Sequence, residues 1–383
     1  MVNALMGLGG LLFLLVILNG VVVNGERVKL FVFGDSTVDC GTNNYINTSM
    51  ENQANYFPYG DNGFFGHPTG RFSDGRVAPD FIAELANLPL IPPYLQKKVD
   101  HSNGANFASG GAGVLKGTNE GLVVDLETQV AQFMDLVERY KIKLGHFEAK
   151  QMVSNAVYYV SIGSNDYLVG YLPDSEAQQL YTGDEFRDFV IGNLSAQIQI
   201  LYNCGARKFL LSSVADLGCL PGIRALTNGT CLESATFLSV SHNTALEKLL
   251  TNLTSILLDF KYIVFDLFEF LTVRTENPQK YGFIEALEAC CGTGPFRGLD
   301  TCGGKNGVAE YHLCPDSAVH MWFDAYHCTE SVHRQVGQTL WEGTDNVVKP
   351  LPLKVFFDDE ALHVYLEQPG KEMIAQTIGC SSQ

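Results

Sequence analysis

Five short apolar runs, rich in residues that favour strands, alternate along this chain with longer segments whose apolar residues recur at helical spacing. The strand-like runs lie at 28–33, in the first part of 104–113, and at 156–162, 208–214 and 262–265, and the principal helix-like segments lie at 77–88, 126–140, 185–204, 237–260 and 330–342. Strands that alternate with helices favour a parallel sheet covered by helices on both faces. Right-handed crossovers then bring the carboxyl ends of the strands to one side, where α/β proteins place their binding and catalytic residues.

Composition limits the domain organisation and the partners of a protein with such a sheet. At 383 residues the chain can form one large domain or two, and neither a linker nor an internal repeat requires two. Apolar residues make up 46% and glycines number 38, which indicates a globular protein with many tight turns. A formal charge of −17 would repel a phosphate backbone, so we expect no nucleic-acid partner.

The first 25 residues are predicted to be a secretory signal peptide. Residues 4–23 are apolar apart from Asn19 and a few glycines, and residues 23–25 offer small or neutral side chains for cleavage. No Lys or Arg precedes this run, and about 20 apolar residues would just span a bilayer, which leaves a signal anchor as the alternative. Because the globular pattern begins within a few residues, we favour cleavage and a secreted protein, extracellular, apoplastic or vacuolar, with no stable membrane insertion.

Two further features agree with secretion. Four acceptor sequences for N-glycosylation occur, at Asn47, Asn193, Asn228 and Asn252. The chain also has ten cysteines, and six of them gather in two loops, Cys219 and Cys231 in one and Cys290, Cys291, Cys302 and Cys314 in the other. Disulfides within each loop are the preferred interpretation, because two adjacent cysteines do not have the spacing of a zinc site. Residues 353–383 are expected to form a C-terminal extension of unknown role.

The strongest candidate for catalysis is Ser36. The apolar run at 28–33 leads directly into Gly34, Asp35 and Ser36, so a buried strand would end by presenting a serine hydroxyl at the edge of the sheet. Taken alone, this serine is better explained as a helix N-cap. Asp324 and His327 change the balance, because they supply an acid and a base that can share one turn.

Two other polar clusters are predicted at strand ends. The glycines of 104–113 fit neither a dinucleotide-binding loop nor a phosphate-binding loop, and they favour backbone N–H groups that approach a substrate oxygen closely. Asn165 follows the strand at 156–162. Ester cleavage needs a nucleophile, a base, an acid that orients the base, and donors for an oxyanion, and these clusters can fill all four roles. The loop at 42–76 is left open between a surface loop and a wall of the site.

Several ordered blocks together resemble plant-type members of the GDSL, or SGNH, lipase and esterase family, over roughly residues 29–352. They are Phe33-Gly-Asp-Ser36 with Asp39, Gly41, Asn43 and Asn44, then Gly70 to Arg76, Asn106 to Gly113, Ile162 to Asp166, Leu217 to Pro221, Ala289 to Gly292 and Phe323 to Glu330. The resemblance implies a flavodoxin-like three-layer α/β/α sandwich with a five-stranded parallel sheet, in agreement with the five strand-like runs.

Carried over to this sequence, the resemblance implies that Ser36 is the nucleophile, His327 the base and Asp324 its orienting acid. The oxyanion hole would comprise the Ser36 N–H, the Gly110 N–H and the Asn165 side-chain amide. No cofactor or metal is implied.

The resemblance also suggests disulfides between Cys290 and Cys302 and between Cys291 and Cys314. The pairing of Cys40, Cys204, Cys328 and Cys380 is left open. A Cys40–Cys328 bridge is a hypothesis, because a formed triad would bring both near one another.

Two departures from the family pattern stand out. Thr42 replaces an Asn of the first block, and Cys328 replaces the proline that usually follows the catalytic histidine, so this loop loses a fixed φ and gains a thiol.

The sequence therefore predicts a secreted serine hydrolase that cleaves acyl esters of small molecules or lipids through an acyl-enzyme on Ser36. The alternatives are an acyltransferase with the same triad and a catalytically silent binding glycoprotein. A silent protein should have lost a triad residue, and none is lost. An α/β-hydrolase is disfavoured because no G-x-S-x-G sequence occurs.

Overall fold

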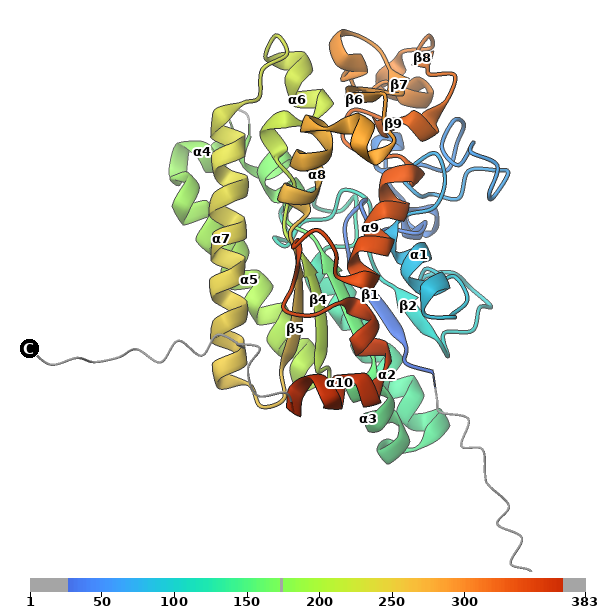
Figure 1. The fold of residues 1–383 in the computed structure, drawn as a ribbon, viewed down its shortest axis with the longest axis vertical. Helices are drawn as coiled ribbons and strands as arrows, with labels where there is room; N and C mark the ends of the chain where they lie inside the picture. The colour runs from blue at the N-terminus through green and yellow to red at the C-terminus, as the bar shows by residue number, and fades with distance from the viewer. Residues whose placement is uncertain (1–26, 173–174, 368–383) are drawn as a thin grey trace, which may run out of the picture.

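A six-stranded sheet with the order β10-β5-β4-β3-β1-β2 forms the centre of the computed structural model, which describes residues 27–172 and 175–367 (Figure 1). The strands are β1 (Leu30–Gly34), β2 (Gly104–Asn106), β3 (Val157–Ser161), β4 (Lys208–Ser212), β5 (Lys261–Phe265) and β10 (Val348–Lys349). Strands β1 to β5 are mutually parallel, whereas β10 pairs with β5 in the antiparallel sense. The predicted five-stranded parallel sheet is confirmed, and β10 adds an edge strand.

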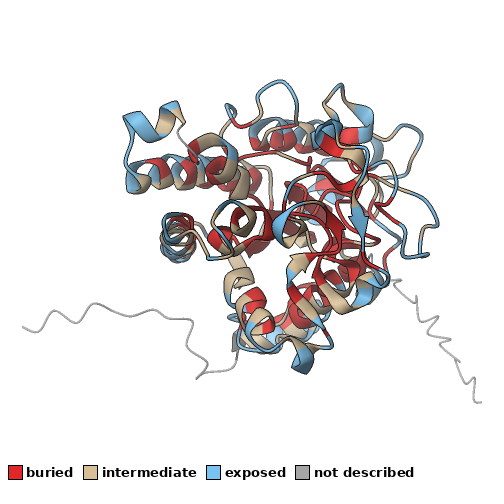
Figure 2. Cartoon of the chain, turned by 90° about the horizontal axis from the view of Figure 1, so that it is seen from above, coloured by how far each residue is buried: buried red, intermediate tan, exposed pale blue. Residues whose placement is uncertain are grey.

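Helices cover both faces of this sheet, which gives the predicted three-layer α/β/α arrangement. The longer helices are α1 (Ala78–Leu85), α2 (Leu126–Leu144), α3 (His146–Asn155), α5 (Gly183–Asn203), α7 (Glu233–Ile256), α8 (Leu267–Glu276) and α9 (Glu330–Glu342), and the shorter ones are α4 (Glu176–Leu180), α6 (Pro221–Leu226) and α10 (Asp359–Glu367). Helix α5 packs against α2 and α7, and α1 packs against α9. Seen from above, the helices are buried toward the sheet and exposed on their outer sides (Figure 2).

Aromatic packing fixes the position of β1. Phe31 and Phe33 lie with their ring centroids 5.1 and 5.8 Å from that of Phe133 on α2, and Phe33 stacks on Phe107 at 4.9 Å. All four side chains are fully buried. Each such burial contributes about 1.5–3 kcal/mol before the entropy of ordering is counted. The turn that follows β1 is therefore anchored to a fully buried aromatic cluster.

A cysteine-bearing excursion lies above the carboxyl ends of the strands (Figure 1). It consists of two small sheets, in which β6 (Glu285–Ala289) pairs with β9 (His320–Trp322) and β7 (Cys291–Gly292) pairs with β8 (His312–Leu313). Its cysteines form a second small core with Tyr59, Phe72 and Phe323.

The predicted disulfide between Cys219 and Cys231 is confirmed. These two cysteines, together with Asp216, form the one group of potential metal ligands found among the described residues. Because both thiols are consumed by the disulfide, the group does not have the donors of a metal site.

The other four cysteines also pair among themselves, as predicted, but the suggested partners were wrong. The bridges join Cys290 to Cys314 and Cys291 to Cys302. The register of β7 and β8 explains this choice: Cys291 lies opposite Leu313, which places Cys314 beside Cys290, and the Cys314 N–H donates to the Cys290 carbonyl at 2.8 Å. Adjacent strand residues point to opposite faces, so Cys291 is left for Cys302.

Part of the expected C-terminal extension packs on the domain. Leu353 and Phe356 are fully buried, and Asp359 of α10 forms an ion pair with Lys208 at 2.7 Å. The predicted signal peptide and Cys380 lie outside the described residues. None of the helices in 27–172 and 175–367 combines the length and hydrophobicity that a membrane crossing requires.

Candidate active site

The turn that carries Ser36 is held at the end of β1 by close backbone contacts. A Cβ atom at Gly34 would lie 2.1 Å from the Ser161 carbonyl oxygen, so only glycine fits there. The buried amide of Gln129 accepts from the Gly34 N–H at 2.8 Å and donates to the Gly34 carbonyl at 2.9 Å. Ser36 follows this fixed point and is 8% exposed. The serine hydroxyl is thus presented from a rigid turn.

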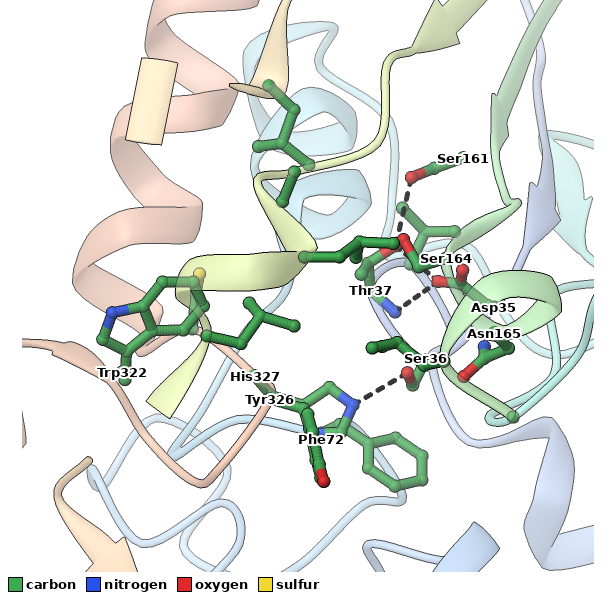
Figure 3. A pocket seen from close by; sticks show the side chains of 18 of the residues that line it. Asp35, Ser36, Thr37, Phe72, Ser161, Ser164, Asn165, Trp322, Tyr326 and His327 are labelled. Carbon is green, nitrogen blue, oxygen red and sulfur yellow. Dashed lines mark hydrogen bonds between the residues drawn. The ribbon is translucent and has the colours of Figure 1, made fainter. Parts of the chain in front are cut away.

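The structure brings Ser36, His327 and Asp324 together, and Figure 3 shows the contact between Ser36 and His327. Ser36 Oγ lies 2.8 Å from His327 Nε2, and His327 Nδ1 lies 2.8 and 2.9 Å from the two carboxylate oxygens of Asp324. An ionised carboxylate only accepts, so Nδ1 carries the proton and Nε2 is free to accept the proton of the serine hydroxyl. The backbone N–H groups of Tyr326 and His327 also donate to Asp324 Oδ1, at 2.9 and 2.8 Å.

Sequence reasoning missed Tyr59. Its hydroxyl, fully buried, donates to Asp324 Oδ2 at 2.7 Å. Burial and the neighbouring Asp324 charge raise the pKa of Tyr59 well above its ordinary value, so the phenol remains a donor. The only signal in the sequence was an aromatic-rich loop, which does not single out one tyrosine.

The loop at 42–76 is a wall of the site. Its Phe72 packs against the His327 ring at a centroid distance of 4.8 Å. Asp74 Oδ1 accepts the Glu330 N–H at 2.7 Å, and Arg76 forms an ion pair with the Glu330 carboxylate at 2.9 Å. Glu330 begins α9, three residues after His327. The loop therefore fixes the chain on the C-terminal side of the histidine.

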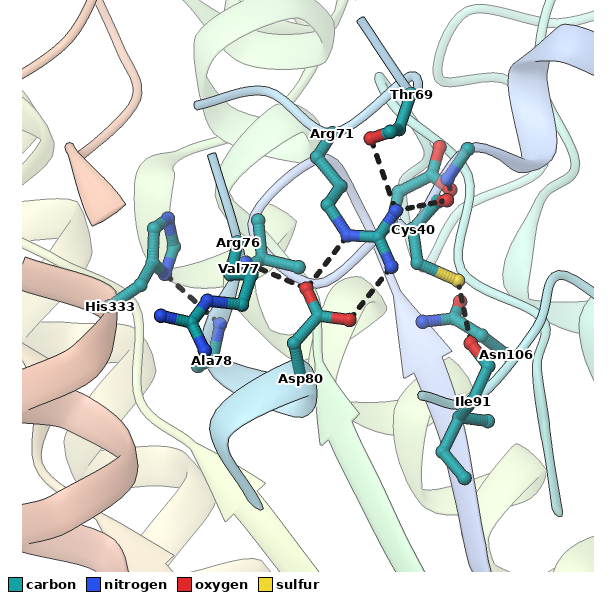
Figure 4. A network of polar contacts seen from close by, with 12 residues as sticks. Cys40, Thr69, Arg71, Arg76, Val77, Ala78, Asp80, Ile91, Asn106 and His333 are labelled. Carbon is teal, nitrogen blue, oxygen red and sulfur yellow. Dashed lines mark hydrogen bonds and ion pairs between the residues drawn. The ribbon is translucent and has the colours of Figure 1, made fainter. Parts of the chain in front are cut away.

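Arg71 anchors the same loop to the nucleophile turn (Figure 4). Its guanidinium makes two hydrogen bonds of 2.7 Å to the Asp80 carboxylate and donates to the Cys40 carbonyl at 3.1 Å. Both charged side chains are almost fully buried, at 7% and 2% exposure. A paired, bidentate geometry is what makes such burial tolerable.

The predicted Cys40–Cys328 disulfide is absent, and this hypothesis was wrong. Cys40, Cys204 and Cys328 are free thiols. The Cys40 Sγ donates to the Ile91 carbonyl at 3.1 Å (Figure 4). Cys328 instead borders the cavity beside His327.

The predicted oxyanion donors differ in their availability. Asn165 borders the cavity, and its Nδ2 donates one hydrogen to the Ala112 carbonyl at 3.0 Å, which leaves the second hydrogen. The Gly110 N–H already donates to the Asp39 carboxylate at 2.9 Å. For the Ser36 N–H the described residues offer no hydrogen-bond acceptor.

A cavity of about 380 Å³ runs past Ser36 and His327. Polar residues at the strand ends, including Asp35, Ser161 and Ser212, line one part of it. Apolar residues in or next to α6, α8, α9 and β9 line another part of it, namely Leu220, Ile223, Leu271, Trp322, Val332 and Val336. Such a space suits an apolar chain attached to a reacting carbonyl at Ser36.

Comparison with known proteins assigns the chain to a family. Residues 30–340 match the family model of GDSL-like lipases and acylhydrolases. The chain belongs to this family. It is 43% identical over 348 residues to the GDSL lipase of Tanacetum cinerariifolium, an alignment that covers 91% of this chain and 92% of that protein.

Two Arabidopsis thaliana proteins of the family are equally similar. GDSL esterase/lipase 1 is 42% identical over 89% of this chain and 92% of its own length, and GDSL esterase/lipase 5 is 45% identical over 84% of both. The GDSL protein described here is thus a carboxylic ester hydrolase of this family.

Proposed function

We propose that the protein is a secreted serine hydrolase that cleaves acyl esters through a covalent intermediate on Ser36. The observation that carries the proposal is the unbroken chain of hydrogen bonds from Ser36 Oγ through the imidazole of His327 to the Asp324 carboxylate, at 2.8 Å for each step. Three residues in this relation activate a hydroxyl for attack on a carbonyl.

In the first half-reaction, Ser36 Oγ attacks the ester carbonyl while His327 Nε2 takes the hydroxyl proton. His327 then returns this proton to the departing alcohol. Asp324 remains ionised and stabilises the imidazolium that forms between these steps. In the second half-reaction, a water molecule loses its proton to His327 and attacks the acyl-enzyme; the bond between Ser36 Oγ and the acyl carbon then breaks, His327 returns the proton to Ser36 Oγ, and the acid is released.

The negative oxygen of each tetrahedral intermediate requires donors. The Ser36 N–H and the second hydrogen of the Asn165 amide support this role, because neither forms another hydrogen bond within residues 27–172 and 175–367. The Gly110 N–H would have to share its hydrogen with Asp39. We therefore assign the first two donors the larger share of oxyanion stabilisation.

Secretion is supported by the apolar N-terminal segment at 1–25 and by three disulfides, which are typical of oxidising compartments. The side chains of all four predicted glycosylation sites, Asn47, Asn193, Asn228 and Asn252, are exposed, as attachment of a glycan requires. Residues 26–352 would then form the mature hydrolase domain.

Hydrolysis of nitrophenyl esters with increasing acyl length tests this proposal, with and without added alcohols. We expect turnover by the wild type and almost none by Ser36→Ala, because no other hydroxyl in the described part of the chain forms a hydrogen bond with His327 Nε2. If an added alcohol diverts most of the acyl group into a new ester, the same triad serves as an acyltransferase. Wild-type turnover by Ser36→Ala would refute the acyl-enzyme.

A further inference from the structure

Lys305 carries a positive charge in a place where lysines are rarely found. Its side chain is 1% exposed, although a lysine is almost never fully buried without a close partner. The nearest carboxylate, that of Asp300, lies 3.6 Å from Nζ, which is beyond normal hydrogen-bond length. The ring centroids of Tyr59 and Phe72 lie 5.1 and 5.4 Å from Nζ, within the range of cation–π attraction.

Each of these two rings contacts one residue of the triad. The Tyr59 hydroxyl donates to Asp324 Oδ2 at 2.7 Å, and the Phe72 ring packs on His327 at 4.8 Å. A cation against a phenol ring draws electron density from it, which strengthens the hydroxyl as a donor. A single aromatic ring thus separates the ammonium group of Lys305 from Asp324, and another separates it from His327.

The charge of Lys305 also acts on the acid directly. Burial alone would raise the pKa of the Asp324 carboxyl, but His327, Lys305 and Tyr59 together hold this pKa below its ordinary value. The triad works only while Asp324 is ionised, since a protonated acid would not hold the Nδ1–H tautomer of His327.

The chain around Lys305 is built to keep it there. Lys305 lies in the turn η7 (Cys302–Gly307), which begins at the Cys291–Cys302 disulfide. At Gly303, which has φ +70°, an added Cβ would lie 2.4 Å from the Tyr56 ring and 2.8 Å from the Phe57 carbonyl oxygen. The turn is therefore seated directly on the segment that leads to Tyr59.

We infer that Lys305 is a positioning residue, which holds Tyr59 and Phe72 against the triad and stabilises the charge of Asp324. This inference rests on the proposed function, since it assigns Lys305 to the same triad. The disulfide-bonded turn thus contributes to catalysis through Lys305, although it contains no residue of the triad.

Opposite charge changes at Lys305 and Asp300 provide the test. In the pH profile of kcat/KM, the fall toward acid pH, called here the acid limb, reports protonation of the catalytic base in the free enzyme. Lys305→Met removes a cation near His327 and favours the imidazolium, so the acid limb should move to higher pH. Asp300→Asn removes an anion from the same neighbourhood and should move the limb to lower pH. The double variant should return it toward the wild-type position.

These variants leave the other titratable groups near His327 in place. These groups are Asp324 on its own loop, Asp35 after β1, and His333 on α9, whose pKa is lowered to about 4 by burial so that it is neutral above that pH. Lys208→Met is the matched control: this lysine is also buried and ion-paired, with Asp359 at 2.7 Å, but it begins β4 at the far end of the sheet. It should leave the acid limb in place.

We also expect Lys305→Met to lower kcat by about tenfold, a fraction of the roughly 10²–10⁴ that a positioned base supplies. Lys305→Arg should recover part of this loss. If Lys305→Met and Asp300→Asn move the acid limb in the same direction, or leave it unmoved, Lys305 is a packing residue only and the inference fails. An inactive wild type would instead count against the proposed function.

Discussion

Asp324 receives more hydrogen bonds than any other member of the triad, and only some of them could be predicted. The hydrogen bond between Asp324 and His327 could be predicted, because two residues three positions apart can share one turn. The bond between Asp324 and Tyr59 could not, since 265 positions separate the two residues and the sequence around Tyr59 contains several aromatic residues. Lys305 was missed for the same reason: its role arises only when the loops meet.

Tyr59→Phe should lower turnover by about ten- to a hundredfold, because it removes a hydrogen bond to a buried charge that is worth roughly 1.5–3 kcal/mol. KM should change little, since Tyr59 is absent from the walls of the cavity. Steady-state kinetics measure the effect. Tyr56→Phe is the control: its ring packs on Tyr59, but its hydroxyl makes only a long contact of 3.5 Å with Met50. Equal losses in both variants would mean that ring packing, rather than the hydrogen bond, matters.

His242 gives a prediction for stability. It is fully buried, and burial lowers its pKa from 6.5 to about 4. The unfolded chain therefore binds this proton more readily, so the stability contributed by neutral His242 is complete above pH 6.5 and is lost as the pH falls toward 4.

Urea unfolding of the wild type and His242→Gln tests this sign. The difference in the free energy of unfolding should be smaller at about pH 5 than at about pH 7, because only the wild type loses stability through this histidine. A difference that grows as the pH falls would contradict it.

At the level of elements, the sequence predicted the buried strands better than their edges and loops. Strands β1, β3 and β4 were recognisable because each is an apolar run that is buried on both faces. Strand β10 has only two residues, which is too short for any periodicity. The partners of Cys290 and Cys291 depended on the register between β7 and β8, which two-residue strands do not reveal either.

Removal of the Cys291–Cys302 disulfide should affect activity as well as stability. The double change Cys291→Ser and Cys302→Ser should lower the free energy of unfolding by about 3 kcal/mol, as expected for a loop of this size. It should also lower kcat at temperatures where the protein remains folded, because the turn that holds Lys305 is no longer tied to β7. Loss of stability with unchanged kcat would separate the disulfide from catalysis.

Helix α6 should limit the acyl chain. Ile223 is 9% exposed and borders the cavity. Ile223→Trp should reduce kcat/KM for nitrophenyl decanoate by at least about tenfold, through overpacking of the space for the chain, and should leave nitrophenyl acetate within about twofold. The acetate ester is the internal control. Equal losses for both esters would show that the change disturbs the triad rather than the chain-binding wall.

For the whole molecule, the fold and the proximity of Ser36 to Asn165 were predictable for one physical reason. Parallel strands end at the same edge of a sheet, so polar residues that follow β1 and β3 had to lie close together. The position of Asp324 and His327 did not follow from the sheet. It depends on the excursion that contains β6 to β9 and on the loop at 42–76, which is joined to α9 through Asp74 and Glu330.

The most direct test of the central claim is to identify the residue that becomes covalently modified. The protein is treated with a fluorophosphonate, and its peptides are mapped by mass spectrometry. We predict a single adduct on the peptide that contains Ser36, no adduct in Ser36→Ala, and much slower labelling in His327→Ala, because the serine then lacks its base. An adduct on another residue in the wild type, or undiminished labelling of Ser36→Ala, would contradict the assignment of Ser36 as the nucleophile.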